Sequence, residues 1–119
     1  MARAMQVPLQ IAFHHLRGSE AVKGLIEEKV AWLERFYGRI TGCRVRLEAP
    51  QRGRRQGGRY RVRIDLAVPQ GEVVVNRQPP RRAGHEDLEA AIQHTFDAAR
   101  RQLEEHARRL RRDPRPGPA

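Results

Sequence analysis

Two stretches of the chain, CRVRLEA (residues 43–49) and YRVRIDLAV (residues 60–68), decide the fold because apolar and polar residues alternate along both. A period of two is typical of a β-strand with one buried face. If Ala49 faces Tyr60, all the apolar residues share one face, whereas a slip of one residue would put the two sets on opposite faces. The two stretches therefore predict a β-hairpin with one apolar face and one arginine-rich face.

Two further strands are predicted around this hairpin. Alternation over Gln6–Phe13 predicts a first strand, and Pro8 places that strand at a sheet edge or at its own beginning. A turn at residues 69–71 leads into another strand over Glu72–Arg77. The run Val73–Val75 does not reveal which side chains of this strand point inward.

Helical spacing of apolar residues predicts two amphipathic helices. The first begins after an N-cap at Ser19 and stops at Gly38. The second begins near His85–Asp87 and ends before Asp113, because the residue before Pro114 disfavours helical backbone. The apolar stripe of the first helix comprises Val22, Leu25, Ile26, Val30, Leu33 and Phe36, and that of the second comprises Leu88, Ala91, Ile92, Phe96, Ala99, Leu103 and Leu110.

The predicted order is β-α-β-β-β-α, which places the chain in the α+β class. The simplest arrangement is a mixed or antiparallel four-stranded sheet with both helices packed on one face, similar to a double-stranded-RNA-binding domain. Residues 1–112 are predicted to form this single domain, and residues 113–119 a disordered C-terminal tail.

The charge balance favours a polyanionic partner. The 119 residues carry 24 Lys and Arg against 14 Asp and Glu, a net charge of +10. Such a charge on a small domain makes nucleic acid the first candidate partner and an anionic membrane the second. No apolar run approaches the ~18–20 residues of a membrane-spanning helix, and the start of the chain lacks the pattern of a signal peptide, so a cytoplasmic protein is predicted.

The positive charge is concentrated on the predicted hairpin. Residues 43–68 contain eight basic and two acidic residues, a net charge of +6, whereas residues 85–112 contain six of each. Like charges repel across neighbouring strands, so a phosphate partner is the favoured interpretation. The alternative is an ordinary solvated sheet face on which Glu48 or Asp65 pairs with some of the arginines.

The aromatic residues favour recognition of the RNA backbone over base stacking. Tyr60 has inward parity, Phe36 and Phe96 belong to apolar stripes, and Trp32 lies at the edge of its stripe. The predicted open sheet face therefore carries no aromatic side chain on which a base would stack. We expect arginine side chains to contact phosphate oxygens of folded RNA instead.

No catalytic, cofactor or metal site is predicted. The single cysteine, Cys43, has inward parity and is interpreted as a small buried apolar residue. His14 and His15 would point to opposite faces of a strand, and no acidic cluster supplies further metal ligands. We therefore expect a non-enzymatic protein that uses neither a cofactor nor a small-molecule substrate.

Two helical motifs in this order resemble a known family. HEDLEAAIQHTFDAARRQLEEH (residues 85–106) and VKGLIEEKVAWLERFYGRI (residues 22–40) are similar to the helices of the bacterial hibernation-promoting factors, also called ribosome-associated inhibitors or ribosomal subunit interface proteins. The resemblance runs from about Gln6 to Arg112 and is closest to the short form of the family, which lacks a C-terminal dimerising domain.

The resemblance implies a cytoplasmic translation inhibitor of slow growth or cold stress. Such a protein binds the small ribosomal subunit in the channel used by mRNA and tRNA, blocks initiation and preserves idle ribosomes. By position, the basic residues of the family's helices correspond to Lys23, Lys29, Arg35, Arg100, Arg101 and Arg108. With the arginines of the strands, the linker and the helix end, the full set of predicted RNA-binding residues is Lys23, Lys29, Arg35, Arg44, Arg46, Arg59, Arg61, Arg63, Arg81, Arg82, Arg100, Arg101, Arg108 and Arg112. The alternatives are a general structured-RNA-binding module and an arginine-rich adaptor for an acidic protein.

Overall fold

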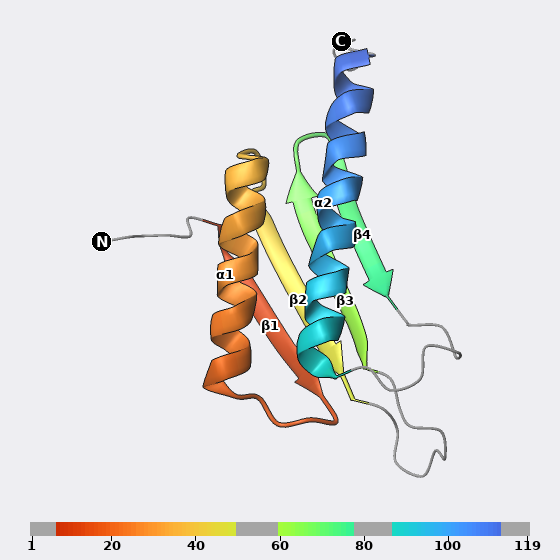
Figure 1. Ribbon diagram of the computed structural model, residues 1–119. Helices are drawn as coiled ribbons and strands as arrows, with labels where there is room; N and C mark the ends of the chain where they lie inside the picture. Colours follow the sequence, from red (N-terminus) through yellow and green to blue (C-terminus); the bar gives the residue numbers. More distant parts are fainter. Residues whose placement is uncertain (1–6, 50–59, 78–86, 113–119) are drawn as a thin grey trace.

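The computed structural model describes residues 7–49, 60–77 and 87–112, and within them it contains the predicted β-α-β-β-β-α order. A four-stranded sheet forms one layer and two helices form the other (Figure 1). The elements are β1 (Leu9–His14), α1 (Glu20–Phe36), β2 (Gly42–Glu48), β3 (Arg61–Val68), β4 (Gly71–Arg77) and α2 (Leu88–Arg112).

The strands lie in the sheet in the order in which they occur in the sequence, β1-β2-β3-β4. β1 and β2 are parallel, as expected of strands joined through a helix, and the other two pairs are antiparallel. Glu48 lies opposite Arg61, which is the register predicted from the pairing of Ala49 with Tyr60. The sheet is therefore mixed, and the hairpin prediction is confirmed.

The first strand begins later than predicted. It starts at Leu9, with Val7 buried ahead of it, while Gln6 lies outside the described residues. Pro8 has no N–H to donate, and its carbonyl oxygen accepts a hydrogen bond from the Cys43 N–H at 3.0 Å. Pro8 thus marks the beginning of an edge strand, as its chemistry predicts.

Both helices cover the same face of the sheet, α1 over β1 and β2 and α2 over β3 and β4 (Figure 1). The apolar core fills the space between the two layers, and its largest fully buried side chains include Phe96, Ile26 and Leu33. Val73 and Val75 point into this core whereas Val74 is 37% exposed, so the structure supplies the parity that the valine run did not reveal. The opposite face of the sheet is left open.

Different hydrogen bonds cap the two ends of α1. The Ser19 hydroxyl accepts a hydrogen bond from the Val22 N–H at 3.1 Å, which confirms the predicted N-cap. The last helical residue is Phe36 and Tyr37 is the C-cap residue with an extended backbone (φ −138°, ψ 99°), so Gly38 directly follows the cap, where a helix-ending glycine is expected. The Tyr37 N–H still donates to the Leu33 carbonyl at 2.8 Å and closes the last turn.

Ser19→Ala is expected to lower the free energy of unfolding by about 1 kcal/mol, because it leaves the Val22 N–H without its side-chain acceptor. Urea unfolding followed by circular dichroism measures this change. Ser19→Asp supplies another acceptor at the positive end of the helix and is the matched control, expected to stay within about 0.5 kcal/mol of the native chain. Equal stability of the alanine variant would contradict a role for the cap.

α2 matches its predicted extent, since it begins at Leu88 and ends at Arg112. The Asp87 carboxylate accepts a hydrogen bond from the Ala90 N–H at 2.8 Å, as a capping residue does. The predicted apolar stripe did not include two polar side chains that are buried, Thr95 and His106. The Thr95 hydroxyl donates to the Ala91 carbonyl at 2.7 Å, and the His106 ring lies edge-on to Tyr37 at a centroid distance of 6.5 Å.

Candidate nucleic-acid interface

The predicted strand arginines lie together on the open face of the sheet. Arg44 and Arg46 on β2 alternate with buried Val45 and Leu47, so their side chains point away from the helices. On β3, Arg61 is exposed and Arg63 is half-buried, and both alternate with buried apolar residues in the same way. The strand register brings Arg46 directly opposite Arg63.

Carboxylates offset part of this positive charge. The Arg63 guanidinium donates to both oxygens of Asp65, Nε to Oδ1 at 2.8 Å and Nη2 to Oδ2 at 3.4 Å, and this pairing raises the pKa of Arg63 above its ordinary value. Asp65 also lies opposite Arg44 in the register, and Glu48 lies opposite Arg61. Within the described strands the open face is therefore less cationic than the charge count of the whole hairpin predicts.

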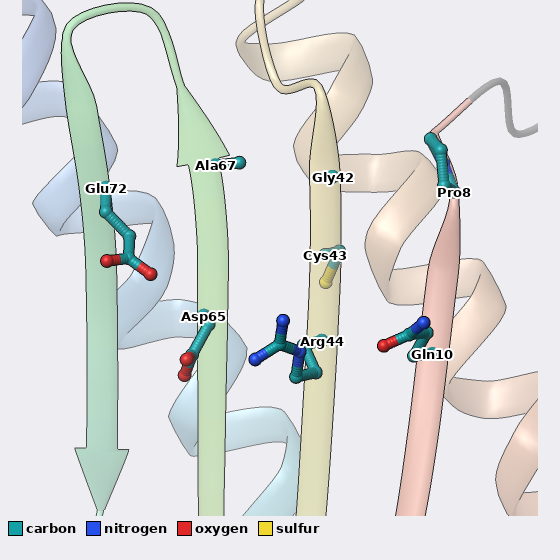
Figure 2. Close-up of a pocket in the computed structure, with 8 residues that line it drawn as sticks. All are labelled: Pro8, Gln10, Gly42, Cys43, Arg44, Asp65, Ala67 and Glu72. Carbon is teal, nitrogen blue, oxygen red and sulfur yellow. The ribbon is translucent and has the colours of Figure 1, made fainter.

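An open hollow with a mixed polar and apolar lining lies on the same face near the start of β2. It has a volume of about 230 Å³ and forms where Gly42 and Ala67 contribute little or no side chain. Figure 2 shows the Arg44 guanidinium directed toward Asp65, and Glu72 and Gln10 standing on the neighbouring edge strands. The hollow combines hydrogen-bond donors with carboxylate acceptors, so this end of the face is not a uniform anion site.

Cys43 lies beneath this hollow and is only 6% exposed. Burial raises the pKa of its thiol from 9.0 to about 12, and the nearby Asp65 carboxylate adds to the shift. A thiol with so high a pKa is not ionised at neutral pH and is a poor nucleophile. The structure thus confirms the interpretation of Cys43 as a small core residue.

The protein is expected to lose stability as the pH rises from about 9 toward 12, because the unfolded chain ionises the Cys43 thiol while the folded chain keeps it protonated. The loss is roughly 1 kcal/mol per pH unit. Chemical unfolding at pH 8, 9, 10 and 11 gives the slope for the native chain and for Cys43→Ala, in which tyrosine and lysine still titrate. Parallel curves for the two proteins would contradict the assignment.

The predicted basic residues of α1 occupy three different settings. Lys23 is exposed, with its Nζ atom 3.7 Å from a Glu20 carboxylate oxygen. The Nζ atom of Lys29, a half-buried residue, lies 5.5 Å from the centre of the Trp32 ring, a cation–π contact that accounts for a lysine within an apolar stripe. Arg35 is exposed near the C-terminal end of the helix.

On α2, Arg101 and Arg108 are exposed, whereas Arg100 is half-buried. Arg100 does not lie opposite the apolar stripe: its guanidinium carbon is 5.3 Å from the centre of the Phe36 ring on α1. Phe36 in turn is 41% exposed instead of buried. Helix–helix packing brings these two residues together at the C-terminal end of α1.

The remaining predictions fall partly or wholly outside the described residues. Arg59, Arg81 and Arg82 lie there, as do the linker at 78–84 and the tail at 113–119, and Arg112 is described only as the last residue of α2. In the described ranges, no salt bridge joins Glu104 or Glu105 to Arg108 or Arg109. No group of three or more His, Cys, Asp or Glu side chains is placed to hold a metal ion in the part of the chain that the structure covers. Among the described helices, neither is long and apolar enough to cross a membrane.

Comparison with known proteins agrees with this geometry. The sequence profile of the Sigma 54 modulation protein / S30EA ribosomal protein family matches residues 9–111. A ribosome hibernation promoting factor of Azotobacter vinelandii is 34% identical over 102 residues, which cover 86% of this chain and 82% of that protein. One from Pseudomonas putida is 31% identical, over 86% of each chain. A longer ribosome hibernation promotion factor of Deinococcus radiodurans is 31% identical, and the match covers 92% of this chain and 58% of that one.

Two solved structures share the fold. The N-terminal domain of Protein Y from Thermus thermophilus aligns with a TM-score of 0.62 at 21% identity, over 84% of this chain and 99% of that one. A ribosomal subunit interface protein from Coxiella burnetii aligns with a TM-score of 0.65 at 13% identity, over 85% of this chain and 98% of that one. The profile match over residues 9–111 and the identities to the Azotobacter vinelandii and Pseudomonas putida proteins show that the chain belongs to the Sigma 54 modulation protein / S30EA ribosomal protein family, the non-enzymatic, ribosome-associated hibernation factors.

Proposed function

We propose that the protein binds the small ribosomal subunit in the channel used by mRNA and tRNA, and that it holds idle ribosomes intact while blocking initiation. The observation that carries this proposal is the placement of exposed basic side chains on a fold shared with ribosome hibernation promoting factors. Action on ribosomes implies that the protein works in the cytoplasm.

Among the described residues, positive charge is more concentrated on the helix layer than on the open sheet face. Residues 100–112 of α2 contain six arginines and two glutamates, a net charge of +4. The C-terminal end of α2 extends past the end of the sheet, where a partner can approach it from several sides (Figure 1). Arginine binds phosphate through two parallel N–H donors, so such a helix end suits an RNA backbone.

The open sheet face supplies a second cationic surface, whose arginines alternate with carboxylates. Phosphates contacting Arg44 and Arg46 would compete with Asp65 and Glu48 for nearby guanidinium groups. A surface of this kind favours a partner with phosphates at defined positions over an arbitrary polyanion. We therefore propose that both layers contact rRNA and that the spacing of their arginines selects its folded shape.

Cosedimentation with purified small subunits and, separately, large subunits tests the proposal at 50 and 300 mM KCl. We expect the protein to pellet with small subunits and to be released at high salt, because binding through phosphates displaces condensed counterions. Failure to pellet with small subunits, or pelleting that is indifferent to salt, would refute the proposed function.

A competition assay separates this function from general binding of structured RNA. Unlabelled duplex RNA is added to the complex of labelled protein and small subunits at equal phosphate concentration. A ribosome-specific protein remains bound to the subunits, whereas a general reader of duplex RNA redistributes onto the competitor. Recovery of an acidic protein after nuclease treatment would instead support an adaptor.

A further inference from the structure

The C-terminal end of α1 presents an aromatic ring that the fold does not bury. Phe36 is 41% exposed, whereas Phe96 on the other helix is completely buried. Phe36 and Val74 are the two exposed large apolar residues in the described part of the chain. They lie on different layers, because Val74 belongs to the sheet and Phe36 to the helices.

An arginine side chain from α2 contacts this ring. The Arg100 guanidinium carbon lies 5.3 Å from the centre of the Phe36 ring, within the range of a cation–π contact. Lys29, Trp32 and Phe36 are spaced by three and four residues and therefore lie on one side of α1, and the contact with Arg100 shows that this side faces α2. Trp32 packs against the core, and the exposed ring continues the same line of aromatic residues toward solvent.

Further arginines lie close to the exposed ring in the sequence. Arg35 precedes it, Arg39 follows three residues later, and both are exposed. The basic part of α2 begins with Arg100 itself. A lone exposed apolar residue on a protein surface is ordinary. An exposed aromatic ring in contact with Arg100 of α2, with Arg35 and Arg39 near it in the sequence, combines the two parts of a single-strand nucleic-acid site, a stacking platform and phosphate contacts.

We propose that Phe36 stacks against an unpaired nucleobase of the bound RNA, with Arg100 and the neighbouring arginines holding the phosphates on either side. This inference rests on the proposed function and adds a second mode of contact to it, since the residue pattern alone favoured backbone contacts without stacking. The ligand class is an unpaired nucleotide in a loop or single-stranded segment. Stacking on a ring accepts any base, so the site tolerates different sequences.

The test uses the full chain and two fluorescein-labelled probes, a 12-nucleotide oligoadenylate and an abasic ribose-phosphate chain of the same length. Fluorescence anisotropy measures binding at several salt concentrations. Phe36→Leu keeps an apolar side chain without a ring, Phe36→Tyr keeps the ring, and Val74→Ala is the matched control that trims the other exposed apolar residue. Thermal unfolding of each variant shows that it is folded.

We expect Phe36→Leu to weaken oligoadenylate binding by about tenfold, the loss of one base–aromatic stack, while the tyrosine variant and the Val74 control stay within about twofold. Binding of the abasic chain is expected to be unchanged by Phe36→Leu. The slope of log affinity against log salt is also unchanged by that variant, whereas Arg100→Gln lowers it by about 1.

Three outcomes would overturn the inference. The first is equal oligoadenylate binding by the Phe36→Leu variant and the native chain. The second is an equal loss of affinity for oligoadenylate and for the abasic chain in that variant. The third is a loss of ribosome binding without a loss of oligoadenylate binding, which would assign the ring to a protein contact. Cosedimentation of the native chain with small subunits tests the proposed function separately, so failure of the stacking site is distinguishable from failure of the function.

Discussion

Phe96→Ala is expected to lower the free energy of unfolding by about 3–5 kcal/mol, the largest stability change proposed for any single side chain of this protein. Phe96 is the largest fully buried side chain and lies in α2, the helix that covers β3 and β4 (Figure 1). The alanine variant loses the free energy gained by transferring the ring from water into the core. It also leaves a cavity that the surrounding structure fills only partly. Because a domain of this size is stable by about 5–15 kcal/mol, the variant approaches the limit of folding.

Urea unfolding followed by circular dichroism measures this effect. Gln93→Ala is the matched control, since Gln93 is exposed on the same helix and its replacement is expected to change the free energy by less than about 0.5 kcal/mol. Phe96→Leu refills most of the space and is expected to fall between the two. A loss below about 1 kcal/mol for the alanine variant would mean that the described packing of α2 on the sheet is wrong.

The elements could be predicted from the sequence because their periodicities are strong and their ends carry specific chemistry. Alternation along β2 and β3 excludes a slip of one residue, which would put the two apolar sets on opposite faces, and the structure has the register predicted from the pairing of Ala49 with Tyr60. Ser19 and Asp87 are found as the capping acceptors of their helices. The start of β1 was missed because alternation continues through Pro8, whereas the hydrogen-bonded ladder requires an N–H that proline lacks.

The contact between Arg100 and Phe36 could not be predicted, because it depends on how two helices pack. Arg100 directly follows the buried Ala99, so it is turned only about 100° from the core and lies on a flank of α2. Which flank meets another helix is a tertiary property. Phe36 has core spacing, but it is the last residue of α1, where the neighbouring helix offers an arginine side chain in place of an apolar surface.

The charge of the open face was overestimated for a related reason. Parity correctly placed the strand arginines on one side, but Asp65 and Arg63 are two residues apart on β3 and therefore share that side. Their pairing depends on side-chain rotamers, which the alternation pattern does not specify. The strands thus present a mixed surface, and the more concentrated positive charge of the described residues lies toward the end of α2.

Arg101→Gln/Arg108→Gln is expected to weaken binding to small ribosomal subunits by about 50- to 100-fold at 0.1 M salt. Each lost phosphate contact lowers the salt slope by about 0.9, which is close to tenfold in affinity at this concentration. Both side chains are exposed on α2, so the substitutions are expected to leave the fold intact. Arg44→Gln/Arg46→Gln makes the same change of charge on the open sheet face and tests that surface independently.

The decisive comparison is with a pair of arginines that belong to neither proposed surface. Arg17 is exposed ahead of α1, and Arg77 ends β4 on the same side as the buried Val73 and Val75. Arg17→Gln/Arg77→Gln removes the same two charges from the chain and is expected to lower affinity by less than about threefold. If all three double variants lose affinity equally, the protein is attracted by its overall charge, and neither surface is an interface. If only the α2 pair loses affinity, the helix layer alone faces the ribosome, and the sheet arginines serve as partners for their own carboxylates. Loss in both predicted pairs, with a slope reduced by about 2 in each, is the result that two contact surfaces require.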